Sequence, residues 1–246
     1  MSGHSKWSTI KRKKGKADAE RGKIFTKLIR EITTAARFGG GDENSNARLR
    51  TALVAAKAAN MPQVNIDRAI KKGTGELPGV VYEEKAYEGY GPGGVAVMID
   101  TLTDNTNRTT SEVRHLLTKH QGNMGEVGCV SWIFEKKGLI AVNRQDCEEG
   151  KLMDLAIDAG AADITIEDDV YEVITLPENF IKVKEKFGDA HIPIVSEEIT
   201  MIAKTTVKVE GAHAEQIVKL LEALEELDDV QQVYSNFDID EKEIKE

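Results

Sequence analysis

Apolar residues in the first third of the chain recur at helical spacing. Between residues 18 and 38 they gather on one side of a helix when successive residues are turned by about 100°. The predicted inward set is Ile24, Phe25, Leu28, Ile29, Ile32 and Ala36. The glycine run 39–41 cannot continue a helix, so we expect this helix to end there.

Two further short helices are predicted before residue 75. Asn44 to Asn46 cap the first of them, and its inward positions are Leu49, Ala52, Leu53 and Ala56. The second begins after Pro62 and ends at Lys71-Lys72-Gly73. Its inward positions are Val64, Ile66, Ala69 and Ile70. Three helices with small apolar faces predict a compact helical domain.

Beyond Gly79 strands and helices alternate. Strands are predicted over residues 80–91, 94–102 and 129–137. Between the last two strands, Thr109 and Glu112 form a capping-box pattern that starts a helix. Residues 138–203 then follow the order βαββαβ of ferredoxin-like domains. The predicted strands are 139–143, 163–167, 170–176 and 192–202, and the predicted helices are 151–161 and 179–188.

The last part of the chain, residues 205–239, reads as strand, helix, strand, which is only the second half of such a unit. Residues 94–134 supply its first half, so the complete unit between them is predicted to be an insertion. The predicted fold class is α+β multidomain, with a small N-terminal three-helix domain and two ferredoxin-like α/β domains, one inserted into the other. The domains are 1–78 (basic arm and helical domain), 79–136 plus 204–240 (discontinuous middle domain) and 137–203 (inserted domain).

Charge is unevenly distributed along this pattern. The chain has a net charge of −9, yet residues 1–75 hold 17 lysines and arginines against six acidic residues, a net charge of +11. The remaining residues therefore carry −20. This segregation predicts a polyanionic partner for the first third. Internal pairing of these cations with the chain's own carboxylates would contradict that prediction.

The basic residues lie on a cationic arm and on the polar side of the first predicted helix. We predict that they neutralise the phosphates of a nucleic acid, without reading its sequence. The candidate nucleic-acid-binding residues are Lys6, Lys11, Arg12, Lys13, Lys14, Lys16, Arg21, Lys23, Lys27 and Arg30. Trp7, beside the arm, fits either a stacking role or a packing role.

Catalytic and metal chemistry find no support in the sequence. The five histidines are scattered, Cys129 and Cys147 form no CxxC pair, and the glycine runs lack a phosphate-loop pattern. We therefore predict no catalytic residues, no metal site and no cofactor. The start of the chain lacks an apolar segment after its charges, and no run approaches 18 apolar residues. We expect a cytoplasmic protein without membrane association.

A second candidate site is a cleft between the α/β domains, lined by Tyr90, Asn105, Asn107 and Arg108. The segment 104–108 is rich in hydrogen-bonding groups, and an Asx-type turn explains most of them. Arg108 is also able to reach a phosphate or a carboxylate. This site supports a different hypothesis, a protein that senses a small anion.

Several sequence blocks resemble the YebC family, which is similar to the mitochondrial translational activator of cytochrome c oxidase. They are GHSKW (3–7), RGKIFTKLIREI (21–32), GGGD (39–42), NARLR (46–50), YEGYGPGG (87–94), DNTNRT (104–109) and EVRH (112–115). The resemblance implies a helical domain, two ferredoxin-like domains and a cytoplasmic, non-enzymatic regulator of gene expression. Family members are described as DNA-binding transcriptional regulators or as ribosome-associated factors that aid synthesis through consecutive prolines.

The resemblance and the charge pattern together predict a nucleic-acid-binding regulator of transcription. The alternative is a ribosome-associated translation factor that binds ribosomal RNA. The expected partners are DNA or ribosomal RNA, with ribosomal proteins as further partners for the acidic remainder, and we expect a monomer. A protein-only adaptor is the remaining hypothesis, in which the basic arm meets an acidic partner.

Overall fold

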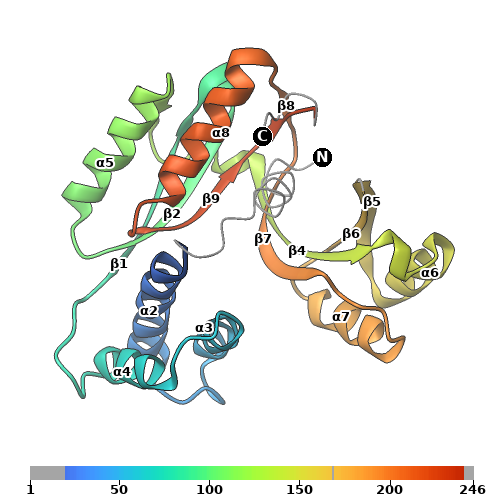
Figure 1. Ribbon diagram of the computed structural model, residues 1–246, viewed down its shortest axis with the longest axis horizontal. Coiled ribbons are helices and arrows are strands. Elements are labelled where there is room, and N and C mark those ends of the chain that lie inside the picture. The colour runs from blue at the N-terminus through green and yellow to red at the C-terminus, as the bar shows by residue number, and fades with distance from the viewer. Residues whose placement is uncertain (1–19, 168, 241–246) are drawn as a thin grey trace. The chain divides into compact units, whose positions relative to one another are not determined.

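The computed structural model describes residues 20–167 and 169–240, which divide into two compact units (Figure 1). The described residues up to Trp132, together with those from Thr205 onward, form the first unit. The second unit is Ile133–Lys204. None of the described helices is both long and apolar enough to cross a membrane. The predicted domain boundary at residue 78 stays a prediction.

The first unit begins with three packed helices, α2 (Glu20–Gly39), α3 (Ala47–Ala58) and α4 (Gln63–Thr74). The four inward positions predicted for α3 are its buried residues. Asn46 caps α3 by accepting a hydrogen bond from the Leu49 amide at 3.0 Å. Two predicted inward residues are wrong, because Ile24 and Val64 are 40% and 66% exposed. The helices otherwise form the small apolar core that the spacing predicts.

Gly73 does not end α4 as predicted. The helix continues to Thr74 and ends at Gly75, which adopts the left-handed conformation with φ of 86°. Gly73 is buried where α4 crosses α2, and a Cβ there would overlap the Thr33 carbonyl oxygen and lie 2.7 Å from Ala36 Cβ. A glycine is therefore needed for the close approach of the two helices.

The rest of the first unit is a four-stranded antiparallel sheet in the order β3-β1-β2-β9. Its strands are β1 (Glu83–Tyr90), β2 (Ala96–Thr103), β3 (Asn123–Met124) and β9 (Val230–Ser235). Helices α5 (Thr106–Lys119) and α8 (Gly211–Glu225) pack on one face of the sheet and share one hydrophobic core with it (Figure 1). The short strands β8 (Val207–Lys208) and β10 (Phe237–Asp238) pair with each other in a separate parallel sheet.

This arrangement is ferredoxin-like, but one strand comes from a different place than predicted. The central position next to β2 is filled by β1, which precedes β2 in the chain, and not by the segment after residue 204. Residues 129–133 are not part of a strand either. The Glu88 carboxylate accepts hydrogen bonds from the amides of Gly128, Val130 and Ser131 at 2.7 to 2.8 Å, which holds this segment in a loop.

The second unit confirms the predicted βαββαβ order. It runs through β4 (Phe134–Asn143), α6 (Glu149–Ala159), β5 (Ala161–Glu167), β6 (Val170–Thr175), α7 (Phe180–Asp189) and β7 (Ser196–Ala203). The strands lie in the order β5-β6-β4-β7, which is the ferredoxin-like arrangement. The fold is thus α+β, with a helical domain and two sheet domains. The sheet domain of residues 133–204 is inserted into the chain of the other sheet domain.

Candidate nucleic-acid interface

Most of the predicted phosphate-binding residues lie outside the described part of the chain. These are Lys6, Lys11, Arg12, Lys13, Lys14 and Lys16. The side chain of Arg21, another candidate, also lies outside the described part. Trp7 lies outside it as well. The structure therefore describes three of the candidates, Lys23, Lys27 and Arg30, all on α2.

The basic side of α2 faces the C-terminal end of α8. Lys23 Nζ lies 3.6 Å from Glu226 Oε1, and Lys27 Nζ donates a hydrogen bond of 2.9 Å to the Glu225 carbonyl oxygen. Cations are stabilised at this end of a helix, where carbonyl groups lack intrahelical partners. The predicted stripe thus contacts the chain's own helix in this structure.

Arg30 forms the strongest of these internal contacts. Its guanidinium pairs with the Asp229 carboxylate, donates a hydrogen bond of 2.8 Å to the Leu102 carbonyl oxygen and lies 5.3 Å from the centre of the Tyr82 ring. The Arg30 side chain is only 12% exposed. Its Nη1 group donates to two internal acceptors, which disfavours phosphate binding by Arg30, and its role in phosphate binding stays a prediction.

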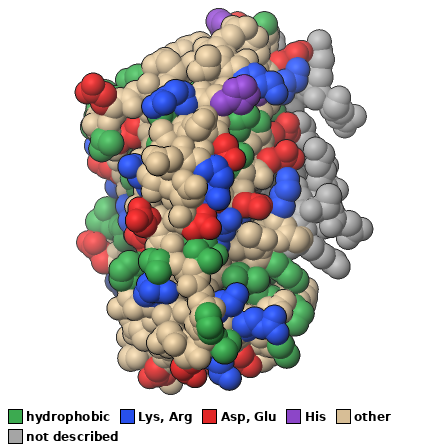
Figure 2. Space-filling model, turned by 90° about the vertical axis from the view of Figure 1, so that its left-hand side faces the viewer, with side chains coloured by type: hydrophobic (Ala, Val, Ile, Leu, Met, Phe, Trp, Pro, Cys, Tyr) green, Lys and Arg blue, Asp and Glu red, His purple; other side chains and the backbone are tan. Residues whose placement is uncertain are grey.

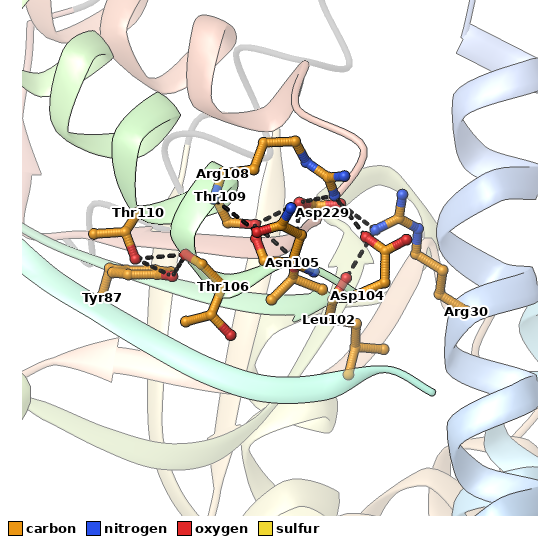
Figure 3. A network of polar contacts seen from close by, with 11 residues as sticks. Arg30, Tyr87, Leu102, Asp104, Asn105, Thr106, Arg108, Thr109, Thr110 and Asp229 are labelled. Carbon is orange, nitrogen blue, oxygen red and sulfur yellow. Dashed lines mark hydrogen bonds and ion pairs between the residues drawn. The ribbon is translucent and has the colours of Figure 1, made fainter. Parts of the chain in front are cut away.

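Asp229 is the centre of a polar network that joins three segments of the first unit (Figure 3). Besides Arg30, Arg108 donates from Nη2 to both carboxylate oxygens, at 2.7 and 3.0 Å. The hydroxyls of Thr103 and Thr109 donate to Oδ2. The Asp229 side chain is 4% exposed, so these donors replace the water that its charge would otherwise require.

The network favours the ionised form of Asp229. Burial opposes ionisation, but the hydrogen bonds from Thr109, Arg108 and Arg30 outweigh burial and lower the pKa of the carboxyl to about 2. The hydrogen bonds that Arg108 donates to Asp229 and Asp104 likewise raise the pKa of Arg108. We call these residues, Arg30, Thr103, Arg108, Thr109 and Asp229, the Asp229 joint.

The Asp229 joint predicts a specific acid sensitivity. A carboxyl whose pKa is lower in the folded state stabilises the fold fully above its unfolded value of about 3.9 and loses this contribution as the pH falls through about 2. We expect Asp229→Asn, which cannot titrate, to flatten the pH dependence of the free energy of unfolding between about pH 4 and 2. Urea titrations at several pH values measure this. An unchanged slope in the variant would contradict the assigned pKa.

The start of α5 differs from the predicted capping box. Asn105 caps the helix by accepting a hydrogen bond from the Arg108 amide at 3.1 Å, so the helix begins at Thr106. Thr109 is fully buried inside the helix, where its hydroxyl reaches Asp229. The polar segment 104–109 therefore serves two roles, a helix cap and one side of the Asp229 joint.

The four predicted cleft residues do not form one site. The Tyr90 hydroxyl donates to the Cys129 carbonyl oxygen at 3.1 Å, at the end of β1 that pairs with the start of β2. Asn105 and Arg108 follow the opposite end of β2, about 25 Å away for a strand of this length. Asn107 is exposed on α5. The carboxylate that Arg108 contacts is the internal one of Asp229.

Several cations of the helical domain do remain exposed. Arg37, Lys57, Arg68 and Lys71 form no ion pair with another described residue. Arg48, in contrast, pairs with Glu31 and Glu84. Across residues 20–167 and 169–240, no group of three or more His, Cys, Asp or Glu side chains could hold a metal ion. The described surface thus offers exposed cations for a polyanion in addition to those of α2 that have internal partners.

Comparisons with known proteins cover nearly the whole chain. Residues 5–76 match the model of the TACO1/YebC protein N-terminal domain, and residues 82–237 match that of the TACO1/YebC second and third domain. A probable transcriptional regulatory protein of Geobacter sulfurreducens is 60% identical over 245 residues, covering 100% of this chain and 99% of the relative. Another protein of that description, from Syntrophobacter fumaroxidans, is 58% identical, covering 97% and 96%.

A solved structure shares the fold. The crystal structure of a conserved hypothetical protein from Aquifex aeolicus superposes with a TM-score of 0.82 at 52% sequence identity. The match covers 94% of this chain and 96% of that one.

Proposed function

The chain belongs to the TACO1/YebC family, and from this premise we propose that it is a non-enzymatic regulator of gene expression that binds nucleic acid, as a DNA-binding regulator of transcription. The relatives named above carry the name of probable transcriptional regulatory proteins. The observation that carries the proposal is the net charge of +11 on residues 1–75 in a chain whose remainder carries −20. Such a segment attracts a polyphosphate by long-range electrostatics.

The internal contacts of α2 favour other cations as the ones that bind phosphate. Since Lys23 and Lys27 contact the end of α8 and Arg30 pairs with Asp229, the proposed contacts are the basic residues of the arm, together with the exposed cations of the helical domain. The arm residues are Lys6, Lys11, Arg12, Lys13, Lys14 and Lys16. Five or six such contacts on duplex DNA correspond to a slope of about −4.5 to −5.4 in a plot of log K against log salt concentration.

A charge reversal in the arm tests this assignment. We expect Lys13→Glu with Lys14→Glu to weaken binding to all DNA sequences alike and to reduce the steepness of the salt slope by about 2, because each phosphate contact contributes about 0.9. Fluorescence anisotropy with labelled 30-base-pair duplexes of unrelated sequence measures both quantities. The matched control, Lys151→Glu with Lys182→Glu, makes the same charge change at exposed positions of the second unit. Equal losses in both variants would refute a specific role for the arm.

A ribosomal target is the second candidate, and the acidic remainder of the chain favours it. A charge of −20 is repelled by a DNA surface but attracts basic ribosomal proteins. In this case the arm binds ribosomal RNA and the protein acts as a translation factor. Co-sedimentation with ribosomes, compared with footprinting on genomic DNA, separates the two targets. Binding to neither, with a ligand-induced rise in melting temperature instead, would favour a small-anion sensor.

A further inference from the structure

Three cations of α2 form one stripe that faces the end of α8. Lys23, Lys27 and Arg30 are separated by four and by three residues, so they lie within about 60° of one another around the helix axis. Their partners all lie between residues 225 and 229. The start of α2 lies next to the end of α8 (Figure 1), and one side of α2 therefore contacts one short segment of the chain.

This segment is unusually acidic for the C-terminal end of a helix. Residues 222–229 contain no lysine or arginine but five carboxylates, those of Glu222, Glu225, Glu226, Asp228 and Asp229. Carboxylates are unfavourable at this end, because the carbonyl groups without intrahelical partners already carry partial negative charge. The last turn of α8 has no basic residue to offset them. The cations of α2 therefore provide the positive charge that the end of α8 lacks.

The three contacts differ in how easily another anion replaces them. Arg30 and its carboxylate partner are buried, with side chains 12% and 4% exposed, and the Asp229 joint holds both. The pair of Lys23 and Glu226 spans 3.6 Å, and its side chains are 44% and 71% exposed. Such an exposed pair contributes little and is screened by salt. Lys27 donates to a neutral carbonyl oxygen, which is a weaker acceptor than a phosphate oxygen.

Apolar packing does not oppose such a replacement. The hydrophobic core of the helical domain and that of the sheet domain of the first unit are separate clusters. Figure 2 shows acidic and basic side chains next to each other at the level where this sheet domain, above, meets the helical domain, below. Lysine side chains are long and flexible. Lys23 and Lys27 are therefore able to turn from α8 to another anion without exposing either core.

We propose that the acidic end of α8 is an internal competitor of the nucleic acid for Lys23 and Lys27. Without nucleic acid, the Glu226 carboxylate and the Glu225 carbonyl group contact these two cations. A nucleic acid bound by the arm replaces them, and both lysines then contact its phosphates while Arg30 stays in the Asp229 joint. This inference rests on the proposed function and adds a regulation of the same site, because α8 then limits the affinity for phosphate.

The test neutralises the end of α8 in the full chain, with Glu222→Gln, Glu225→Gln and Glu226→Gln. The matched control makes the same charge change at exposed positions of the second unit, with Asp154→Asn, Asp158→Asn and Glu185→Gln. Fluorescence anisotropy measures binding to a labelled 30-base-pair duplex DNA and to a labelled 30-nucleotide RNA. For the duplex we expect the α8 variant to bind about five- to tenfold more tightly at 0.1 M salt, with a salt slope steeper by about 1 to 2, because two phosphate contacts are no longer opposed. The control should stay within about twofold of wild type, because distant exposed charges are screened.

The gain in affinity has to depend on Lys23 and Lys27. In a chain that carries Lys23→Gln and Lys27→Gln, we expect the α8 substitutions to raise the affinity no more than the control substitutions do. A gain of the original size in this background would come from a general loss of repulsion, and it would overturn the inference. If the triple α8 variant melts below wild type, Glu226→Gln alone, at a side chain 71% exposed, gives the same test with an expected gain of about twofold.

The outcomes also separate this inference from the proposed function. If wild type and the α8 variant both bind neither probe, the proposed function fails and this inference fails with it. If wild type binds and the arm variant is impaired, but the α8 variant matches the control in affinity and salt slope, this inference alone is overturned. The nucleic acid then binds through the arm without using α2.

Discussion

Replacing Asp229 by alanine is expected to destabilise the first unit by about 3 to 5 kcal/mol, the range for removing one partner of a buried ion pair. The substitution leaves the Arg30 guanidinium, whose side chain is 12% exposed, without its carboxylate. It also removes one acceptor of the Thr103 and Thr109 hydroxyls, which are both buried. The loss of stability arises more from burying these donors without Asp229 as their acceptor than from losing the attraction between the opposite charges.

Urea denaturation followed by circular dichroism gives the total loss, and amide hydrogen exchange shows where the loss occurs. We expect the exchange of α2 and of the start of α5 to accelerate together, because the Asp229 joint connects them, while the second unit keeps its protection. Asp228→Ala, at the exposed neighbouring position, is the control and should stay within about 0.5 kcal/mol of wild type. If Asp229→Ala lowers the free energy of unfolding by less than 1 kcal/mol, the Asp229 joint does not stabilise the first unit.

The Asp229 joint also shows what sequence can predict about the candidate site. The charge pattern identified the cations of α2, but Arg30 meets a carboxylate 199 residues away. Periodicity carries no information about such a distant partner, and Asp229 sits in an acidic segment where nothing distinguishes it from its neighbours. The unusual density of polar groups in residues 104–109 was the available signal. It marked the right segment, although a cap and a buried network explain it better than an anion site.

The fold followed from periodicity wherever apolar spacing was unambiguous. The inward face of α3 and the βαββαβ order of the second unit are examples. The prediction failed where a glycine was interpreted as the end of a helix or strand. The pattern placed a strand break at Gly138, but β4 runs through it, and a Cβ at this position would overlap the Phe180 ring and the Thr175 hydroxyl. Glycine is required at position 138 by side chains that are distant in sequence, and local spacing cannot reveal such neighbours.

Gly73 gives the sharpest test of this distinction. In an exposed helix, replacing glycine by alanine stabilises by about 1 kcal/mol, because alanine restricts the unfolded chain and favours the helix. At Gly73 the added Cβ meets the Thr33 carbonyl oxygen and the Ala36 methyl group, both on α2. We therefore expect Gly73→Ala to destabilise by about 1 to 3 kcal/mol, the usual cost of overpacking, in spite of its better helix propensity.

The control for Gly73→Ala lies in the helix that Gly73 contacts. A Cβ at Gly22, near the start of α2, meets no atom within 4 Å, so Gly22→Ala should leave the stability unchanged or raise it. Urea denaturation of both variants measures the two free energies of unfolding. Opposite signs indicate that Gly73 is kept for the contact between α2 and α4. If both variants were stabilised, the two helices would tolerate a wider separation, and Gly73 would have no role beyond its helix.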